Sequence, residues 1–194
     1  MIWSPYLGLA TAIALFVTWR VAEDRIRIKV GSPNPRELQD KSQDRGSSRG
    51  VLIAVLVGMG VTLATWILVV GILPWFVSLV GAAIMVIGIT VRCWALSALG
   101  RHFSDRIRTT ADQEIVRSGP YRLVRHPAYT GFLLIFLGFP LLILSGLGFL
   151  VLLALLASAV GYRIHIEEEA LVARFGTPYE AYRKSTWRLI PYVV

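Results

Sequence analysis

Apolar stretches long enough to cross a lipid bilayer recur along this chain, and the charged residues lie almost entirely between them. A transmembrane helix needs about 20 apolar residues, within a range of about 17 to 25. Only 16% of the residues are charged, whereas soluble domains carry about 25%. The sequence therefore predicts an all-α integral membrane protein with five transmembrane helices. These helices are expected at about residues 2–19, 50–70, 72–91, 128–144 and 147–162.

The last two stretches are predicted to form a helical hairpin. As one helix, the 35 residues from Ala128 to Tyr162 would extend about 52 Å, well beyond a hydrocarbon core of about 30 Å. Residues 145–148, with the sequence SGLG, lie near the middle and favour a turn. Two short helices joined by a tight turn fit these constraints better than one long helix.

The placement of charge predicts how the chain crosses the membrane. Every lysine and arginine except Arg92, and every acidic residue, falls within residues 20–49, 98–127 or 163–194. Basic segments stay cytoplasmic, and five spans put all three segments on one side. We therefore expect the N-terminus outside, and the C-terminus and the charged segments in the cytoplasm. The net charge of +8 is then explained by cytoplasmic retention of the basic segments and their contact with anionic lipid head groups. The sequence contains no motif for binding nucleic acid.

The whole chain, residues 1–194, is predicted to form a single membrane domain. The first apolar stretch has its basic residues after it, as an anchor does and a signal peptide does not. Residues 31–49 are polar and rich in helix-breaking residues, which predicts a flexible loop without assigned chemistry. Residues 98–127 keep apolar and aromatic side chains throughout, so we expect a folded, ligand-contacting segment. A segment that lies on the membrane surface is the alternative.

Residues 163–194 are predicted to fold as a helical cap over the cytoplasmic ends of the last two spans. The helix of the fifth span is expected to continue to Phe175, with Gly176 as its C-cap. The next four residues, TPYE, match the start of a new helix with a capping box, in which Thr177 is the N-cap.

A charged cluster follows the fifth apolar stretch directly. On a helix, Arg163 and Glu167 are one turn apart and share a face, and Glu168 is rotated from Glu167 by about 100°. His165 and Glu169 share another face by the same spacing. Ionisable groups at a membrane boundary indicate a functional site. The alternative is a solvated charge cluster where the helix leaves the membrane.

A second cluster, Arg125-His126-Pro127, stands at the start of the fourth stretch. Pro127 fits the first turn of a helix, whose N-terminus suits an anionic or polar ligand group. A simple basic stop before the span is the alternative. The sequence has no Gly-x-Gly-x-x-Gly after a strand, no metal-binding pattern of histidine or cysteine, and no recognisable Ser/His/Asp order. The two charged clusters therefore favour binding of charged ligands at a membrane surface. No metal is expected.

Two motifs stand within residues 100–194. The first is VRSGPY at residues 116–121, followed by RHPAYTG at residues 125–131. The second is the acidic run EEE at residues 167–169, followed by FGTPYEAY at residues 175–182. In order and spacing these motifs resemble the signature of the isoprenylcysteine carboxyl methyltransferases and the related phospholipid methyltransferases. Length and span count are similar to those of a compact prokaryotic-type member.

The resemblance implies transfer of a methyl group from S-adenosylmethionine, which leaves S-adenosylhomocysteine as product. It implies a cofactor at the cytoplasmic ends of the last spans, with Arg163 facing the substrate near the transferred methyl group. Carried over by position, the cofactor contacts are Arg106, Gln113, Glu114, Ile115, Val116, Tyr121, His126, Pro127, Ala128, Tyr129 and Glu167. The family residue at the Arg106 position can be a neutral amide. The implied catalytic residues are Arg163, Glu167 and Glu168, with Glu167 the first candidate among the acids.

Methyl transfer requires alignment of donor and acceptor, which supplies about 7–11 kcal/mol without a metal or a covalent intermediate. Glu167 suits the amino group of the cofactor, and Arg163 suits an acceptor carboxylate. Carboxyl O-methylation of an isoprenylcysteine-like acceptor that enters from the bilayer is therefore the first interpretation. A phospholipid N-methyltransferase and an NADPH-dependent membrane reductase of the sterol type are enzymatic alternatives. A non-enzymatic membrane scaffold or small transporter is another.

Overall fold

The structure, a computed structural model, describes residues 5–31, 44–68, 73–100 and 114–192. These residues form an all-α fold, as predicted. The elements are α1 (Pro5–Val30), α2 (Ser47–Ile67), α3 (Phe76–Leu99), a 3-10 helix η3 (Gly119–Arg122), α4 (Pro127–Leu142), α5 (Gly146–Phe175) and α6 (Thr177–Ser185). Helices α1, α2, α3 and α5 are long and apolar enough to cross a membrane, and α4 is a shorter apolar helix of 16 residues.

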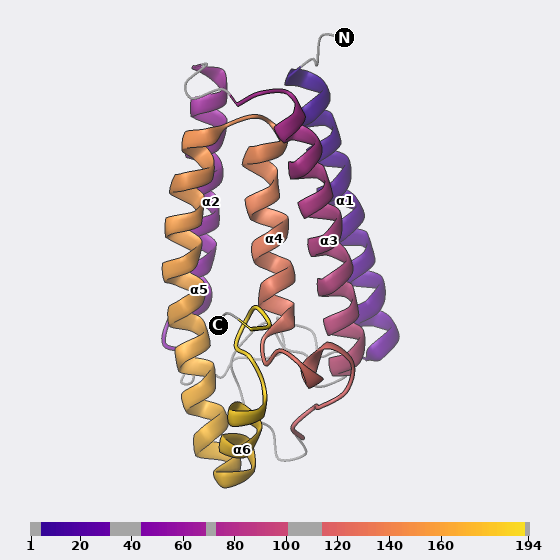
Figure 1. Cartoon of the computed structure of the whole chain (residues 1–194), viewed down its shortest axis with the longest axis vertical. Coiled ribbons are helices and arrows are strands. Elements are labelled where there is room, and N and C mark those ends of the chain that lie inside the picture. Colours follow the sequence, from indigo (N-terminus) through magenta and orange to yellow (C-terminus); the bar gives the residue numbers. More distant parts are fainter. Residues whose placement is uncertain (1–4, 32–43, 69–72, 101–113, 193–194) are drawn as a thin grey trace.

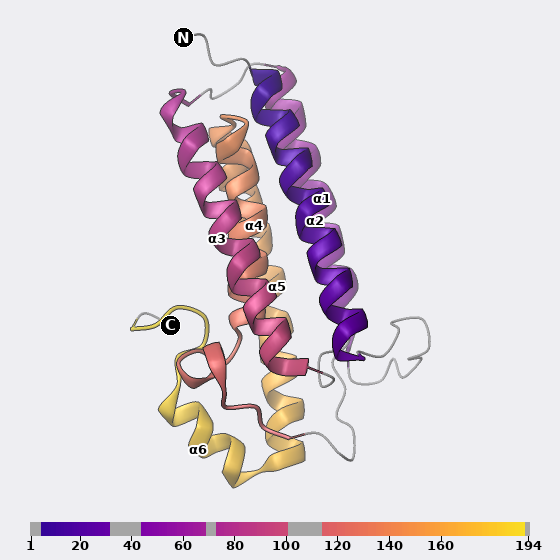
Figure 2. The same ribbon diagram turned by 90° about the vertical axis from the view of Figure 1, so that its right-hand side faces the viewer.

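Helix α4 lies at the centre of the bundle (Figure 1). Helices α3 and α1 lie on one side of α4, and α5 and α2 lie on the other. Helix α4 packs mainly against α3 (Figure 2), while α2 runs along α5 (Figure 1). A helix that is apolar on all its faces is typical of a position enclosed by other helices or lipid. The sequence of α4, PAYTGFLLIFLGFPLL, fits this central position.

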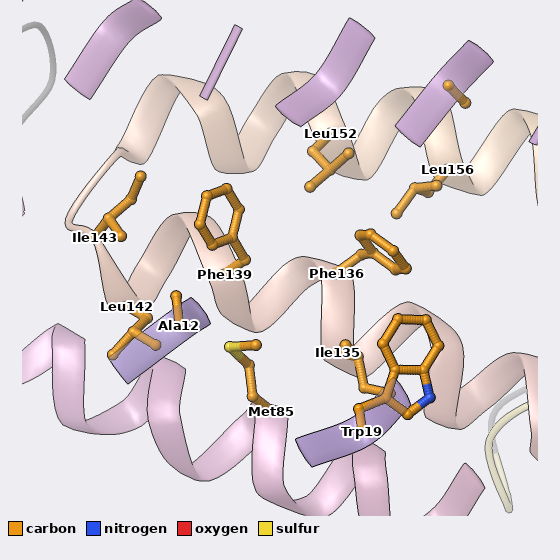
Figure 3. Packing of buried hydrophobic residues seen from close by; sticks show 11 residues of the cluster. Ala12, Trp19, Met85, Ile135, Phe136, Phe139, Leu142, Ile143, Leu152 and Leu156 are labelled. Carbon is orange, nitrogen blue, oxygen red and sulfur yellow. The ribbon is translucent and has the colours of Figure 1, made fainter. Parts of the chain in front are cut away.

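Large apolar side chains fill the space between the helices (Figure 3). Phe136 and Phe139 of α4 lie beside Leu152 and Leu156 of α5, and all four are buried. Trp19 of α1 meets Phe136 edge-on, with the two ring centroids 5.7 Å apart. Within a bilayer, close packing of this kind is what holds helices together, because lipid tails are as apolar as the side chains. The core therefore connects α1 and α5 through α4.

Glycines allow α3 and α4 to approach closely. A Cβ atom on Gly131 of α4 would lie 2.6 Å from the backbone nitrogen of Arg92 in α3. A Cβ atom on Gly81 of α3 would meet the backbone nitrogen of Leu142 in α4. Small residues at a helix interface permit this backbone contact in membrane bundles. These two glycines therefore set the distance between α3 and α4 at both ends of their contact.

Residues 143–145 interrupt the helical structure between α4 and α5. Leu144 has a positive φ of 65°. The Ser145 hydroxyl accepts a hydrogen bond from the Gly148 N–H at 3.2 Å, and it lies 2.7 Å from Thr65 Oγ1 of α2. This interruption begins two residues before the predicted turn at residues 145–148, and the last three residues of that turn instead form the start of α5. The Ser145 side chain caps this helix start. Helix α5 then runs back alongside α4 (Figure 1).

Helix α1 extends further than the apolar stretch that predicts it. The apolar stretch covers residues 2–19, but the helix continues to Val30. Charged side chains one turn apart support this extension, as in the pair of Arg27 and Glu23 at 2.6 Å. The hydrophobic pattern therefore locates the membrane-compatible part of α1 and not the end of the helix.

Gly176 joins α5 to α6. Helix α5 ends at Phe175 with Gly176 as its C-cap, as predicted. The predicted N-cap of the next helix is wrong, because Gly176 and not Thr177 occupies that position, and no side-chain cap hydrogen bond forms. The Gly176 carbonyl accepts hydrogen bonds from the N–H groups of Tyr179 at 3.0 Å and Glu180 at 3.2 Å. Since glycine adopts its φ of 58° without strain, one residue ends α5 and begins α6.

One end of the bundle gathers the segments that carry charge. In Figure 1 the lower end holds the start of α2, the end of α3, the start of α4, the C-terminal part of α5 and α6. Figure 2 shows the same end from the side, with η3 next to α3 and α6 next to α5. Residues that are far apart in the sequence therefore meet at this end.

Candidate functional site

Tyr129 connects the two charged clusters that the sequence analysis singles out. It lies in the first turn of α4. Its hydroxyl donates a hydrogen bond to Glu167 Oε2 at 2.7 Å and accepts one from Arg163 Nε at 2.7 Å. The Arg163 guanidinium also lies over the Tyr129 ring, 5.8 Å from its centroid. The face that Arg163 and Glu167 share on α5 is therefore turned toward α4.

Arg163 has further partners at the start of α2. Its Nη1 donates to Asp44 Oδ1 at 3.1 Å, to Ser47 Oγ at 3.1 Å and to Ser48 Oγ at 2.7 Å. These partners are not predicted from the sequence, because the polar residues 31–49 indicate a flexible loop without assigned chemistry. The sequence DRGSS at residues 44–48 was the available signal, since an acid and serines are typical of a helix start.

Asp44 also accepts hydrogen bonds from the first residues of α2. Its Oδ2 accepts the Ser48 N–H at 3.1 Å, and its Oδ1 accepts the hydroxyls of Ser47 at 3.0 Å and Ser48 at 2.8 Å. Burial by itself would raise the pKa of Asp44, but the hydrogen bonds from Ser48 and Ser47 and the charge of Arg163 lower the pKa overall. Asp44 is therefore a carboxylate at neutral pH and compensates the buried Arg163 cation.

Glu168, the neighbour of Glu167, has a different set of partners. It is buried, with 5% of its surface exposed. Its Oε1 accepts a hydrogen bond from Arg125 Nε at 3.1 Å and lies 3.2 Å from His126 Nε2. Its Oε2 accepts from Arg188 Nη2 at 3.3 Å and lies 3.7 Å from Arg183 Nη2. One carboxylate therefore binds cations from the entry of α4 and from the C-terminal part of the chain.

The chain after α6 runs beside the chain that enters α4. The Arg125 N–H donates to the Trp187 carbonyl at 2.7 Å, and the Trp187 N–H donates to the Leu123 carbonyl at 2.9 Å. The His126 N–H donates to the Arg188 carbonyl at 3.1 Å. This backbone pairing, together with the bonds to Glu168, fixes the chain immediately before α4.

A buried ion pair supports the first turn of α4 from the other side. Arg92 of α3 donates to Glu23 of α1 from Nε at 2.8 Å and from Nη2 at 3.0 Å. The Nη1 of Arg92 donates to the Ala128 carbonyl at 3.0 Å. Ala128 is a predicted cofactor position, so α1 and α3 both support the predicted site. The role of Glu23 is likewise not predicted from the sequence.

The remaining predicted cofactor residues lie in or next to the segment that connects α3 to α4. Arg106 and Gln113 fall outside the described residues. Glu114 is exposed, and Ile115 and Val116 are half-buried. Within the described ranges, no group of three or more histidine, cysteine or acidic side chains is arranged to hold a metal ion.

Tyr121 lies close to the same site. It is buried in η3, and its carbonyl accepts a hydrogen bond from Tyr182 Oη at 2.8 Å. Burial and then the nearby Glu167 carboxylate raise the pKa of Tyr121 well above its usual value. The Tyr121 phenol is therefore neutral. The other predicted residues at the entry of α4 are buried or half-buried, namely His126, Pro127, Ala128 and Tyr129.

Glu169 lies on the exposed side of α5. It lies 3.1 Å from His165 and 2.9 Å from Arg45, and all three side chains are largely exposed. The contact with His165 confirms that these two residues share a face of the helix. Exposed pairs of this kind add little to stability, which fits a solvated acid outside the site.

The long apolar helices and the charged end of the bundle define a multi-pass, all-α membrane protein. A family model described as the isoprenylcysteine carboxyl methyltransferase (ICMT) family matches residues 79–173. Residues 79–173 match this family, and the resemblance seen in the motifs is confirmed. The match includes Tyr129, Arg163 and Glu167 but not Asp44.

Similar proteins include named methyltransferases. A probable protein-S-isoprenylcysteine O-methyltransferase of Oryza sativa subsp. indica is 33% identical over 121 residues, which cover 61% of this chain and 63% of that protein. The protein-S-isoprenylcysteine O-methyltransferase of Saccharomyces cerevisiae is 29% identical over 118 residues, which cover 60% of this chain and 49% of that protein. The chain therefore matches between about half and two thirds of the length of these relatives.

One solved structure has the same fold. It is the eukaryotic intramembrane Ras methyltransferase ICMT, which superposes with a TM-score of 0.68 at 18% sequence identity. The superposition covers 100% of this chain and 70% of that chain. At this identity the likeness establishes the fold alone, and function has to be argued from the site.

Proposed function

We propose that this chain is a membrane methyltransferase that transfers a methyl group from S-adenosylmethionine to the carboxylate of an isoprenylcysteine-like acceptor. The observation that carries the proposal is the hydrogen-bonded set of Glu167, Tyr129 and Arg163, which holds an anion and a cation on one phenol. A carboxylate suits a ligand ammonium group, and a guanidinium suits a ligand carboxylate. The named activity of the rice and yeast relatives supports this choice of reaction.

The residues around the first turn of α4 fit an amino-acid-bearing cofactor. Glu167 is a half-buried carboxylate, and the Tyr129 hydroxyl orients it. The N-terminus of a helix carries partial positive charge and suits a carboxylate. When bound, S-adenosylmethionine supplies an electrophilic methyl group on a sulfonium. In this proposal Glu167 holds the amino group of the cofactor, and the start of α4 holds its carboxylate.

Arg163 is the residue that binds the acceptor in this proposal. Its guanidinium is buried and is fixed by Tyr129 and Asp44. The nucleophile of carboxyl O-methylation is an ionised carboxylate oxygen, so no general base has to remove a proton. A charge-assisted hydrogen bond from Arg163 would orient this oxygen. Orientation of two reactants in this way accounts for a large part of the rate enhancement of such reactions.

Glu168 has a positioning role in this proposal. Its two oxygens accept from Arg125 and Arg188 and lie beside His126, so it joins the C-terminal part of the chain to the entry of α4. Such a residue acts on the reaction through the position of α4 and not through contact with a reactant. The cofactor contacts proposed for Glu114, Ile115 and Val116, and for Arg106 and Gln113 outside the described residues, rest on the family pattern alone.

We assign the fifth membrane span to α4, within one membrane domain that comprises residues 1–194. Its 16 residues extend about 24 Å, slightly less than a hydrocarbon core of about 30 Å. Five spans put the charged end of the bundle in the cytoplasm and the N-terminus outside, since basic segments stay cytoplasmic. The cofactor then enters from the cytoplasm, and the lipophilic acceptor enters from the bilayer.

Isothermal titration calorimetry of the full chain in detergent tests the class of enzyme. We expect S-adenosylmethionine and S-adenosylhomocysteine to bind and NADPH not to bind. Binding of NADPH without binding of either adenosyl compound would identify a reductase and overturn the proposal. A folded protein that binds none of the three compounds would favour the scaffold or transporter alternative.

A further inference from the structure

The turn before α2 and the first two residues of α2 contribute a polar socket to Arg163 from outside the residues that the family model matches. We use the name socket for Asp44, Ser47 and Ser48, which surround Arg163 Nη1 at 3.1, 3.1 and 2.7 Å. The family match covers residues 79–173. The socket therefore belongs to a different part of the chain from the residues of the matched motifs.

The hydrogen bonds of the socket form a closed set. The hydroxyls of Ser47 and Ser48 accept from Arg163 Nη1, and they donate to Asp44 Oδ1 at 3.0 and 2.8 Å. A hydroxyl has one proton to donate, so the carboxylate on one side and the guanidinium on the other fix its direction. Asp44 uses its second oxygen to accept the Ser48 N–H at 3.1 Å. Rotation of the guanidinium would therefore break several hydrogen bonds together.

The socket determines how the cation is oriented. Arg163 Nη1 is held by the socket, while Nε donates to Tyr129 Oη at 2.7 Å. Because a guanidinium is planar and its N–H bonds lie in that plane, hydrogen bonds from two of its nitrogens restrict the orientation of the whole group. The Arg163 side chain is only 7% exposed, so solvent does not compete strongly for these bonds.

We infer that Asp44 is a positioning residue for the methyl acceptor: with Ser47 and Ser48, it fixes the orientation in which Arg163 binds the acceptor carboxylate. The inference rests on the proposed function, because the proposed function assigns the acceptor to Arg163. Asp44 itself contacts neither reactant. A displacement of the start of α2 would break the bonds of Ser47 and Ser48 to Arg163, so the orientation of Arg163 depends on a helix outside the matched motifs.

Three variants test the inference. Asp44→Asn keeps a residue that caps helices well, but the amide has one acceptor oxygen where the carboxylate uses two. Ser48→Ala removes the shortest bond to Arg163 Nη1 and leaves the carboxylate in place. Arg45→Ala is the matched control, because it removes an exposed ion pair with Glu169 from the same turn.

For Asp44→Asn we expect the KM for an S-prenylated cysteine acceptor to rise about tenfold and kcat to fall, because a hydrogen bond between charged groups is lost. The Kd of S-adenosylmethionine should stay within about twofold, since Glu167 keeps its partner Tyr129. Ser48→Ala should act in the same direction with a smaller effect, and Arg45→Ala should match the unaltered protein. An unchanged acceptor KM in both socket variants would overturn the inference. A lower acceptor KM would also overturn it, because Asp44 would then compete with the acceptor for Arg163.

A double-mutant cycle on thermal unfolding separates this inference from the proposed function. The cycle compares Asp44→Asn, Arg163→Gln and the double variant in detergent, and residues in contact give shifts in Tm that do not add. Additive shifts would overturn the socket even in a protein that binds S-adenosylmethionine. Coupled shifts in a protein that binds no S-adenosylmethionine would instead overturn the proposed function and the acceptor role, while the contact itself would stand.

Discussion

Two neighbouring carboxylates on α5 have different surroundings, and these surroundings divide their roles. Glu167 is half-buried and accepts a hydrogen bond from Tyr129. Glu168 is buried and is bound by Arg125 and Arg188. Adjacent residues on a helix are rotated by about 100°, so Glu167 faces the first turn of α4, whereas Glu168 faces the chain just before α4 and the C-terminal part of the chain. In the proposed function the first contacts the cofactor, and the second positions the start of α4.

At this scale, Glu167→Gln and Arg163→Gln should separate cofactor binding from turnover. We expect Glu167→Gln to weaken S-adenosylmethionine binding about 10- to 100-fold, because a hydrogen bond to a charged group contributes about 1.5–3 kcal/mol. Arg163→Gln should keep the cofactor affinity within about threefold and lower kcat/KM for the acceptor on the order of a hundredfold. Calorimetry measures the affinity, and initial rates measure the turnover.

Glu169→Gln is the control for both variants, since Glu169 is an exposed neighbour on the same helix. It should leave cofactor affinity and turnover unchanged. Circular dichroism would verify that Arg163→Gln, which leaves Asp44 without its cation, still folds. Equal losses of cofactor affinity in the Glu167 and Arg163 variants would contradict the division of roles.

At the scale of helices, the contact between α3 and α4 supports the site. Gly131 of α4 lies against the backbone of Arg92 in α3, within the first two turns of α4. The Arg92 side chain also donates to the Ala128 carbonyl one turn earlier. Backbone packing and a charged hydrogen bond therefore act on the same part of α4, which is the part that carries Tyr129.

Gly131→Ala should destabilise the bundle and weaken the site together. The added methyl group has no space against Arg92, and overpacking of this kind costs about 1–3 kcal/mol. The control is Gly161→Ala on α5, where a Cβ atom would meet nothing within 4 Å; in a helix this change is neutral or stabilises by up to about 1 kcal/mol. Thermal unfolding in detergent measures the stability of both variants. The same Tm in the two variants would show that the α3–α4 contact is looser than described.

Over the whole molecule, the sequence predicts the parts of the site that depend on local spacing. The all-helical class follows from the apolar stretches. The shared face of Arg163 and Glu167 follows from their separation of one helical turn, and the family pattern singles out Tyr129. Asp44 could not be predicted in the same way, because its bond to Arg163 spans 119 positions. In the sequence, a polar loop that contacts another helix looks the same as a polar loop that faces solvent. Glu23 is 69 positions from Arg92 and lies beyond the apolar part of α1, so only the arrangement of helices brings the pair together.

Methyl transfer by the purified full chain tests the central claim most directly. The assay supplies methyl-labelled S-adenosylmethionine with an S-prenylated N-acetylcysteine, with the corresponding C-terminal amide, or with phosphatidylethanolamine. Because Arg163 is proposed to bind a carboxylate, we predict a base-labile methyl ester on the acid and no label on the amide or the lipid amine. Label on the phosphatidylethanolamine amine, or an acid and an amide that are labelled equally, would contradict the account.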